Sequence, residues 1–423
     1  MSQRYQTLRG MNDLRPGPIV KEPEFEIHRW HYVENIFFSM AELYGYQEIR
    51  TPMVEEVDLF LRTSGETSDI VSKEMYDFRD KGDRHIVLRP EGTAPAMRAY
   101  LEHSIGGQGM VTRLSYLAPV FRYDRPQRGR YRQHHQAGLE LIGSSSPDAE
   151  VEIMGFVYEF FRRLGLTSLE VALNTIGSKE TRAAYADVIM DYLSSWFADQ
   201  DAEAVAKARK NPLRLLDTKN PELRAALQGL PSLHNYLSDE SRAHFAAVQE
   251  RLAEQGVPFR VNPDIVRGLD YYNDTVFELI SPKLGAQSSL CGGGRYDDLV
   301  PQLGGPPTPS VGVGMGIERA IIVAMQEGVE MPLPRMTAYI IAENEADYPV
   351  VRGMVRELHE LGVSATYDLD GRKRPQQFKQ ANRTGAKYAA IINGANCTVR
   401  DMESGEETPV NQDALGAWFK ERG

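Results

Sequence analysis

Hydrophobic residues recur at helical spacing near the start of the chain. Within residues 24–43 they form one stripe, and its members are Ile27, Trp30, Ile36, Phe37 and Met40. We expect an amphipathic helix here that ends at Gly45, followed by a short strand at 46–50 that stops before Pro52. The first 176 residues mix such helix and strand signals, which predicts a domain that contains both kinds of element.

The pattern then changes along the chain. Residues 178–256 are rich in alanine, leucine and charged residues and carry no strand pattern, which predicts an all-α insertion. Strand signals return at 276–280, so the mixed domain is expected to span 1–326 with the insertion inside it. Residues 327–335 contain two prolines and are expected to form a linker.

Beyond the linker, residues 336–423 alternate between strand-like and helical segments. The strand-like segments are 338–342, 363–367 and 388–392, with helical segments between them. This alternation predicts a small separate α/β domain.

The composition is typical of a globular protein. A chain of 423 residues exceeds one typical core, so two or three domains are expected. The net charge of -11 disfavours a general coat of nucleic acid but permits nucleic acid at a few basic patches. Cys291 and Cys397 cannot form a disulfide framework, and no stretch of about eighteen apolar residues occurs. We therefore expect a cytoplasmic protein without a membrane anchor.

One loop concentrates positive charge on this acidic chain. Five arginines fall within eleven residues: Arg122, Arg125, Arg128, Arg130 and Arg132. Strand-like residues 117–121 precede them and 137–142 follow, which predicts two strands joined by an arginine-rich loop. Because guanidinium groups bind phosphate oxygens in pairs, we expect an anion site, with a solvated charged face as the alternative.

Two further segments offer polar groups, and the first of them follows an expected strand at 86–88. Residues 89–93 read Arg-Pro-Glu-Gly-Thr, and their carboxylate and hydroxyl could hold an ammonium group, although turns often contain these residues. Residues 267–272 read Arg-Gly-Leu-Asp-Tyr-Tyr, where two tyrosines offer hydroxyls and flat faces. An ordinary pair of core tyrosines is the alternative for this second segment.

Glycines crowd at 292–294 and at 312, 314 and 316, without the spacing of a P-loop or of a dinucleotide fingerprint. Glycine spacing alone indicates only tight packing of the backbone. Arg319 follows the second group near an expected helix start, where it could reach a phosphate.

Together these segments resemble the histidyl-tRNA synthetase family of class II aminoacyl-tRNA synthetases, over essentially the whole chain. Residues 9–13 match the family's opening, 121–136 resemble motif 2 of the class and 314–319 resemble motif 3. The helix expected at 24–43 has the place of motif 1, which forms the dimer interface in this class. The Arg-Gly-Leu-Asp-Tyr-Tyr segment and residues 293–297, Gly-Gly-Arg-Tyr-Asp, resemble segments particular to the histidine enzymes.

The resemblance implies a fold and a reaction. The fold is an α+β catalytic domain, with an antiparallel sheet flanked by helices and an all-α insertion, followed by a C-terminal α/β anticodon-binding domain. The partners are L-histidine, ATP with Mg²⁺, tRNA(His) and a second copy of the chain. Histidine attacks the α-phosphate of ATP to give histidyl-adenylate, and the histidyl group then passes to the 3′ end of tRNA(His).

Roles for single residues also follow from the resemblance. Arg122 and Arg267 would be catalytic, because they would neutralise charge that develops on the α-phosphate. Arg319 would hold the ATP phosphates. The residues expected to bind histidine are Glu91, Thr93, Gln136, Glu140, Tyr271, Tyr272 and Tyr296. The first three would contact the ammonium group, Glu140 and Tyr272 would pair with the imidazole nitrogens, and Tyr271 and Tyr296 would close the pocket. The residues expected at the tRNA acceptor end are Arg125, Gln127 and Arg132, whereas Arg128 and Arg130 keep the interpretation of a solvated face.

Two positions depart from the family pattern within the expected ATP site. Asp124 stands where the class usually has glutamate, one methylene longer, so a contact with adenine or the terminal nucleotide would need a bridging water. His134 stands where the family usually has a phenylalanine that stacks on adenine. Because a histidine ring titrates, we expect ATP binding to be weaker or more pH-sensitive than in a His134→Phe variant.

A polar, basic helix is expected in the C-terminal domain. Its candidate contacts with the anticodon are Arg372, Lys373, Arg374, Gln376, Gln377, Lys379 and Arg383. Such contacts would be salt-sensitive, and a solvated helix face is the alternative.

Two other functions are compatible with parts of the resemblance. Some chains similar to this family bind histidine and regulate histidine biosynthesis, but they lack the anticodon-binding domain, whereas roughly ninety residues follow the linker here. A sensor of uncharged tRNA would be expected beside a kinase domain, and the sequence contains no kinase signature.

Overall fold

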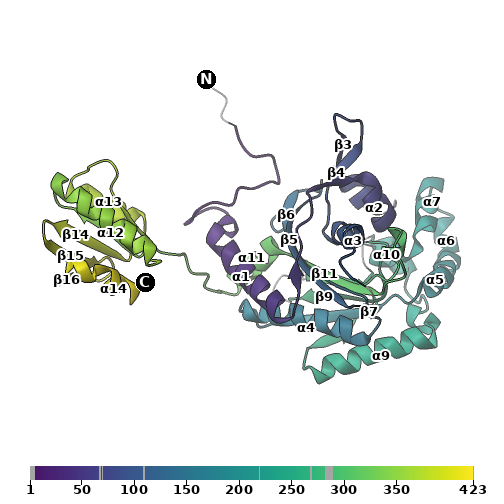
Figure 1. Cartoon of the computed structure of the whole chain (residues 1–423). Helices are drawn as coiled ribbons and strands as arrows, with labels where there is room; N and C mark the ends of the chain where they lie inside the picture. Colours follow the sequence, from purple (N-terminus) through teal and green to yellow (C-terminus); the bar gives the residue numbers. More distant parts are fainter. Residues whose placement is uncertain are drawn as a thin grey trace. The chain divides into compact units, whose positions relative to one another are not determined.

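The computed structural model describes residues 5–65, 68, 70–107, 110–218, 220–266, 269–281 and 289–422 of the chain. Two compact units divide the chain, Met1–Met331 and Pro332–Gly423. Each unit is built around its own β-sheet, as Figure 1 shows.

A mixed sheet of eight strands forms the centre of the larger unit. Its strands lie in the order β1 (Gln47–Glu48), β5 (Thr112–Phe121), β6 (Gln133–Ile142), β11 (Ser310–Gly316), β10 (Ser289–Arg295), β9 (Asn273–Ile280), β7 (Glu170–Thr175) and β8 (Phe259–Val261). The inner strands pair antiparallel, and only the short edge strands β1 and β8 pair parallel with their neighbours. The α+β fold expected from the sequence is confirmed.

Three helices bury one face of this sheet: α1 (Ile27–Leu43), α4 (Pro147–Arg163) and α11 (Ile317–Gln326). The stripe on α1 buries Trp30, Phe37 and Met40 in this core, as the helical spacing predicts. The helix begins at Ile27 rather than at residue 24, because Pro23–Phe25 form a short 3₁₀ turn, η1. Helix α4 begins after Ser146, whose hydroxyl accepts a hydrogen bond from the Asp148 amide.

The opposite face carries a second hydrophobic core together with shorter elements. Helices α3 (Thr93–Glu102) and α10 (Leu299–Gln302) pack there against side chains from β5 and β9. A three-stranded sheet in the order β2 (Val54–Glu56), β4 (His85–Leu88) and β3 (Tyr76–Arg79) lies beyond them, with helix α2 (Val57–Ser64) and the turn η2 (Ile70–Glu74). Side chains alternate across a strand, so this face receives every second residue of the central strands.

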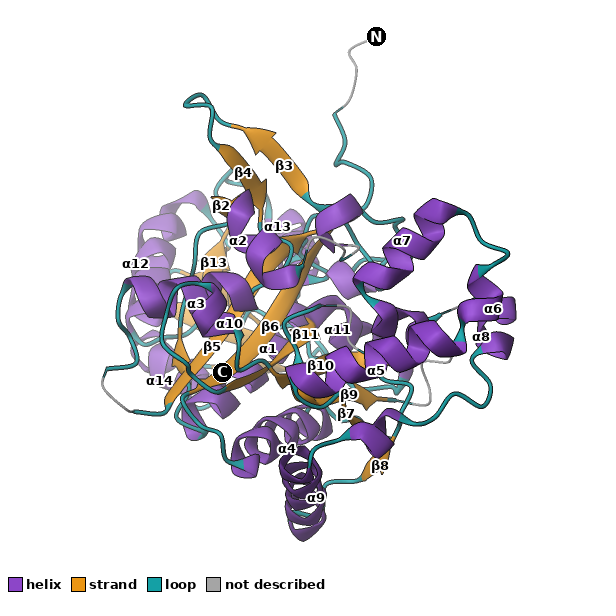
Figure 2. Cartoon of the chain, turned by 90° about the vertical axis from the view of Figure 1, so that its right-hand side faces the viewer, coloured by secondary structure: helices purple, strands orange, loops and turns teal. Residues whose placement is uncertain are grey.

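The described residues of 178–256 contain helices and no strand (Figure 2). They form α5 (Lys179–Tyr192), α6 (Ser194–Phe197), α7 (Ala202–Lys210), η3 (Pro212–Asp217), α8 (Pro221–Ala226), η4 (Leu233–Tyr236) and α9 (Asp239–Glu254). Helices α5 to α8 share a core of their own, whereas α9 lies beside α4 and joins the main core.

The smaller unit has a five-stranded sheet in the order β13 (Ala365–Tyr367), β12 (Ala338–Ala342), β14 (Tyr388–Asn393), β15 (Asn396–Asp401) and β16 (Glu407–Pro409). Strand β12 pairs parallel with β13 and β14, and the remaining pairs are antiparallel. One core holds α12 (Tyr348–Glu360) and α14 (Leu415–Lys420), and a second holds residues of α13 (Arg374–Arg383). The short turns η6 (Glu345–Asp347) and η7 (Gln412–Ala414) precede α12 and α14.

A buried ion pair links α4 to β10. Arg295 Nε donates to Glu150 Oε1 over 2.8 Å, and the two side chains are 3% and 0% exposed. Glu150 also contacts His244 of α9 at 2.6 Å, and Arg295 contacts Asp297 at 3.1 Å. The pair therefore joins the helical layer, the sheet and α9 at one point.

Removing Arg295 leaves the Glu150 carboxylate buried without its guanidinium partner, beside His244. We expect Arg295→Met to lower the free energy of unfolding by about 3–5 kcal/mol. Arg260→Met is the matched control, because the Arg260–Glu170 pair is 52% and 36% exposed and should contribute at most about 1 kcal/mol. Urea unfolding followed by fluorescence measures both variants, and equal losses in the two would contradict the importance of burial.

Candidate active site

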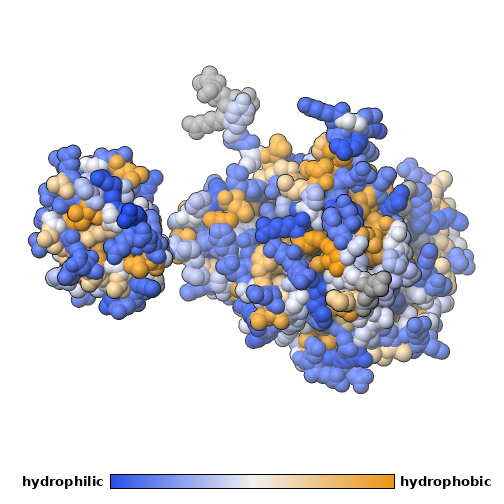
Figure 3. All heavy atoms as spheres, viewed as in Figure 1, coloured by the Kyte–Doolittle hydropathy of each residue, from blue (hydrophilic) through white to orange (hydrophobic). Residues whose placement is uncertain are grey.

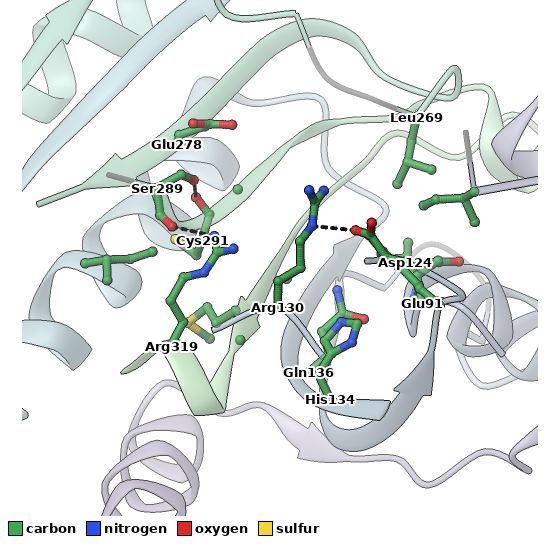
Figure 4. Close-up of a pocket in the computed structure, with 18 of the residues that line it drawn as sticks. Glu91, Asp124, Arg130, His134, Gln136, Leu269, Glu278, Ser289, Cys291 and Arg319 are labelled. Carbon is green, nitrogen blue, oxygen red and sulfur yellow. Dashed lines mark hydrogen bonds and ion pairs between the residues drawn. The ribbon is translucent and has the colours of Figure 1, made fainter. Parts of the chain in front are cut away.

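A cavity of ≈ 570 Å³ opens on the face of the sheet that carries α3 (Figure 4). Strands β6, β9, β10 and β11 contribute to its lining, together with the loop after β5 and residues of 266–272. The described lining includes the guanidinium groups of Arg122, Arg130, Arg214 and Arg319. It also includes the carboxylates of Glu74, Glu91, Asp124, Glu278 and Glu318. The cavity can therefore accept a ligand with several negative charges and still offers acceptors for a cationic group.

Two of the arginines predicted from sequence are anchored to backbone carbonyl groups. Arg122 Nε donates to the Pro90 carbonyl at 2.8 Å, and Arg319 Nη1 donates to the Ser289 carbonyl at 2.8 Å. Burial lowers the pKa of both guanidinium groups from the ordinary value, but both groups remain charged. Their charges are thus aimed into the cavity before any ligand binds.

The arginines of the loop at 122–132 contact groups that the sequence did not predict. Arg130 is exposed, as expected, but it also lines the cavity, where its Nε lies 2.6 Å from Asp124 Oδ2 (Figure 4). Arg128 lies 3.3 Å from Glu24, a carboxylate that is only 3% exposed. Both arginine side chains are exposed, 58% for Arg128 and 52% for Arg130, as expected of a solvated face, and each one also balances a carboxylate.

The three residues expected at the acceptor end of tRNA lie outside the described cavity lining. Arg125 and Gln127 are exposed on the loop. Arg132 is partly buried, donates to the Asp124 carbonyl at 3.1 Å and places its guanidinium carbon 3.8 Å from the centre of the Tyr123 ring. This stacking holds Arg132 against the loop, whereas Arg125 and Gln127 are exposed on it.

Glu91, Thr93 and Gln136 line the cavity together, as do Tyr271 and Tyr272. Glu91 is 1% exposed and its two oxygens accept the amides of Thr93 and Ala94 at 2.6 and 2.8 Å, at the start of α3. Gln136 Oε1 accepts the Gly92 amide at 2.9 Å. Burial raises the pKa of Glu91, which the helix amides partly offset. Glu91 therefore caps a helix while its carboxylate faces the cavity.

Glu140 and Tyr296 are not part of the cavity lining and lie behind it. Glu140 is completely buried, accepts a hydrogen bond from the Tyr116 hydroxyl at 3.1 Å and another from the Tyr296 hydroxyl. Tyr116 is 3.4 Å from the Thr93 hydroxyl, so this hidden row reaches the cavity wall. Burial raises the pKa of Glu140 to about 8. Glu140 and Tyr296, which the sequence placed at the histidine, therefore lie behind the described cavity wall.

The glycines leave space for these polar side chains. A Cβ atom on Gly312 would lie 1.9 Å from Glu140 Oε2, and one on Gly314 would lie 2.1 Å from Gln136 Nε2. A Cβ atom on Gly92 or Gly138 would lie 2.2 Å from the Tyr116 ring. The sequence expectation of tight backbone packing holds at Gly293, where a Cβ atom would lie 2.2 Å from the Gly312 carbonyl oxygen, whereas Gly312 and Gly314 chiefly make room for side chains.

His134 lines the cavity beside Gln136 (Figure 4), and its Nδ1 atom has no hydrogen-bond partner among the described residues. Burial, followed by the charge of Arg122, lowers the pKa of its ring to about 3. The ring is therefore uncharged near neutral pH. The sequence suggested pH-sensitive ATP binding, but the structure does not support it, because the His134 ring titrates far below neutral pH.

Several groups at the cavity were not anticipated. Arg214, Glu278 and Ser289 line it without belonging to any motif that the sequence showed, and Tyr116 supports it from β5. Tyr116 had one readable signal, because an aromatic residue in a strand opposite a glycine, here Gly138, indicates a ring lying over a neighbouring strand. Arg267, expected to be catalytic, lies outside the described residues, as does Gly268.

The basic helix expected in the smaller unit is α13. Lys373, Gln376, Lys379 and Arg383 are exposed there. Gln377 is buried and bonds both backbone groups of Ala342, at 3.1 and 2.9 Å, so it was wrongly expected at the surface. Arg372 and Arg374 lie 2.8 and 2.9 Å from Asp368 and Glu343, and these ion pairs lower the net charge that they present.

Both units match known families. The family model described as histidyl-tRNA synthetase matches residues 23–320, and the one described as anticodon binding domain matches residues 337–422. A histidine–tRNA ligase of Synechococcus elongatus is 41% identical over 415 residues, which are 97% of this chain and 93% of that protein. A histidine–tRNA ligase of Natranaerobius thermophilus is 40% identical over 420 residues, 98% of each chain.

Solved structures agree with these matches. The crystal structure of apo S. aureus histidyl-tRNA synthetase has a TM-score of 0.83 and 31% identity, and the match covers 99% of this chain and 100% of that one. A structure from Bacillus halodurans described as an ATP phosphoribosyltransferase regulatory subunit/histidyl-tRNA synthetase shares the fold, with a TM-score of 0.69 at 21% identity, over 93% of this chain and 100% of that one. The fold and the arginine-lined cavity define a class II aminoacyl-tRNA synthetase. Within this class, the chain belongs to the histidyl-tRNA synthetase family.

The low pKa of His134 has a direct spectroscopic consequence. We expect its ring signals to show no titration between about pH 5.5 and pH 8, because the ring stays neutral throughout. NMR titration of histidine-labelled protein measures this, and the His134→Phe variant assigns the signals. A midpoint near 6.5, the ordinary value for histidine, would contradict the burial of the ring.

Two glycines of β11 should respond differently to the same substitution. Gly312→Ala forces Glu140 or the neighbouring strand to move, so we expect a loss of about 1–3 kcal/mol in the free energy of unfolding. Gly316→Ala should be tolerated, since its Cβ atom would meet nothing closer than 3.7 Å. Thermal unfolding measures the two variants, and equal melting temperatures would mean that the space beside Glu140 is not limiting.

Proposed function

We propose that this chain is a histidine–tRNA ligase, which activates L-histidine with ATP and transfers the histidyl group to the 3′ end of tRNA(His). The observation that carries the proposal is a single cavity that joins Arg122 and Arg319 to Glu91, Thr93 and Gln136. One set of groups suits phosphate and the other suits an amino-acid ammonium group. The matches of both units to families of this reaction support the same conclusion.

Activation is an attack of the histidine carboxylate on the α-phosphate of ATP. Arg122 would stabilise the charge that builds on that phosphate, since its guanidinium is already held by the Pro90 carbonyl. Arg267 would assist it, as the family resemblance implies. Arg319 would bind the ATP phosphates from the β10 side of the cavity. His134 and Asp124 would contact the adenosine part, with His134 as a neutral stacking ring.

Mg²⁺ is part of this proposal. No group of three metal-binding side chains exists among the residues that the structure describes. Glu278, however, lines the cavity on the side of Arg319, and Mg²⁺ usually binds one or two carboxylates together with substrate phosphates. Glu278 therefore fits an ion that would neutralise charge on the pyrophosphate oxygens.

The histidine substrate would lie near the start of α3. Glu91 uses one lone pair of each oxygen for helix amides, which leaves further lone pairs for the ammonium group. Thr93 and Gln136 would complete that contact, and Tyr271 and Tyr272 would close the pocket. Glu140, which also accepts a hydrogen bond from Tyr296, would act on the imidazole through the hydroxyl of Tyr116. A conformational change of the cavity wall could instead bring Glu140 and Tyr296 to the imidazole directly.

Transfer of the histidyl group requires contact with tRNA at two places. Arg125, Gln127 and Arg132 would meet the acceptor end through the motif 2 loop. The exposed groups of α13, namely Lys373, Gln376, Lys379 and Arg383, would contact the anticodon region.

A homodimer and a cytoplasmic location complete the proposal. The family resemblance places the dimer interface at α1 and the segment that follows it. Large hydrophobic residues are exposed near that segment, with Leu43 at 72%, Met53 at 51% and Val54 at 41%. Hydrophobic patches are visible among hydrophilic residues of the larger unit in Figure 3, and a subunit interface would cover such residues. No helix among the described residues is long and apolar enough to cross a membrane.

The regulatory alternative is disfavoured by two observations. A regulatory subunit would not need an anticodon-binding domain, yet residues 337–422 match one. It would also not need charged groups at an ATP site, yet Arg122 and Arg319 both line the cavity.

ATP–pyrophosphate exchange with each amino acid in turn tests the proposal. We expect exchange with histidine alone, because a buried site that pairs the imidazole nitrogens leaves polar groups unpaired with any other side chain. An absence of exchange with histidine would end the ligase assignment. Exchange without charging of tRNA would instead mean that the proposed contacts of α13, or the role proposed for Asp124, are wrong.

A further inference from the structure

Leu269, Tyr271 and Tyr272 form part of the cavity wall, and residues of the helical insertion donate hydrogen bonds to this segment. This short segment precedes β9 and contributes two of the side chains proposed to enclose histidine. The groups that contact it from the insertion are polar side chains of α5, of η3 and of Asn211, the residue before η3.

One contact is an ion pair with a supporting amide. Asp270 Oδ1 accepts from Arg214 Nη2 at 3.0 Å and from Asn211 Nδ2 at 2.8 Å. The second oxygen of Asp270 lies against Gly65, where a Cβ atom would come within 2.1 Å. Asp270 is therefore confined between η3 and the end of α2, and Arg214 itself reaches the cavity wall.

A second guanidinium holds the other end of the segment. Arg182 of α5 donates through Nη1 to the Tyr272 carbonyl at 2.7 Å. Burial lowers the pKa of Arg182, while the carboxylates of Asp298, Asp274 and Asp270 oppose that shift. A charged donor on a backbone carbonyl fixes the main chain, and with it the direction of the tyrosine ring.

Both arginines lie on segments that pack into the core of the insertion. Leu213, beside Arg214, is 8% exposed within the core of the insertion, and Tyr185 and Ile189 of α5 are 2% and 0% exposed in the same core. Movement of the insertion would therefore carry both guanidinium groups with it.

We propose that the helical insertion is a working part of the amino-acid pocket, and that Arg182 and Arg214 are positioning residues that set residues 269–272 for histidine binding. This inference rests on the proposed function for its substrate. It predicts that loss of either contact weakens histidine binding while ATP binding is kept, because Arg122 and Arg319 are anchored elsewhere.

The test measures the KM for histidine and the KM for ATP separately by ATP–pyrophosphate exchange. Because hydrogen bonds between charged groups are strong, we expect Arg214→Ala to raise the histidine KM about tenfold or more. Arg214→Lys should recover part of this loss, since it keeps the charge that faces Asp270. In an Asp270→Asn background, Arg214→Ala should add little, because the two residues act as one pair. Arg182→Ala should raise the histidine KM in the same way.

Arg224→Ala is the matched control, because Arg224 is exposed on α8 and its guanidinium donates to the Thr218 carbonyl at 3.3 Å, within the insertion. It should leave both KM values unchanged. Assays are run well below the melting temperature of each variant, so that unfolding does not enter the comparison. Equal rises in the KM for histidine and for ATP, or a lower melting temperature with unchanged KM, would overturn the positioning role.

Amide hydrogen exchange separates this inference from the proposed function. Peptides that cover 269–276 should exchange faster in Arg214→Ala than in the wild-type chain or in Arg224→Ala, whatever reaction the protein catalyses. Unchanged exchange in these peptides would overturn the inference even if histidine activation were demonstrated. If these peptides exchange faster in Arg214→Ala but the protein does not activate histidine, the positioning contact is supported and only the proposed substrate is wrong.

Discussion

A carboxyl group with no exposure to solvent sits at the centre of the main sheet, and the neighbouring residues are constrained by it. Glu140 on β6 is satisfied by the hydroxyls of Tyr116 and Tyr296. Burying a carboxyl group here without hydrogen-bond partners would cost on the order of several kcal/mol. Both tyrosine hydroxyls must therefore point at Glu140. The strand opposite must also lack a side chain, which is why Gly312 faces the carboxylate.

The same constraint shapes the cavity above. Tyr116 can reach Glu140 only because Gly92 and Gly138 leave space for its ring, and its hydroxyl then lies near Thr93. Gln136 fits beside Gly314 and holds the Gly92 amide, next to the helix that Glu91 caps. The groups proposed to receive the amino acid are thus set by packing in the sheet and by α3, before any substrate arrives. The insertion completes this arrangement from the opposite side, through Asp270 and Tyr272.

Much of the architecture and part of the site could be predicted from the sequence. Periodicity located α1 and the strands on either side of the arginine-rich loop, since helical and strand spacing are local properties. The motifs that resemble the family also pointed to Arg122, Arg319, Glu91 and Gln136, and the structure brings all four to one cavity.

What sequence could not show depends on contacts between distant residues. Arg214 lies 56 residues before Asp270, and nothing local marks it as part of a cavity wall. The pairing of Arg130 with Asp124, the burial of Gln377 and the low pKa of His134 likewise depend on the surroundings of each side chain. An exposed arginine and one that lines a cavity have the same local sequence pattern.

The central claim is that the two units together charge tRNA(His) with histidine. The most direct measurement is aminoacylation of tRNA(His) by the whole chain with labelled histidine and ATP, beside an equal amount of a tRNA for another amino acid. The account predicts that histidine accumulates on tRNA(His), as an ester that mild base releases, and not on the other tRNA. Histidyl-adenylate formation with no transfer to tRNA(His), or equal charging of both tRNAs, would contradict it.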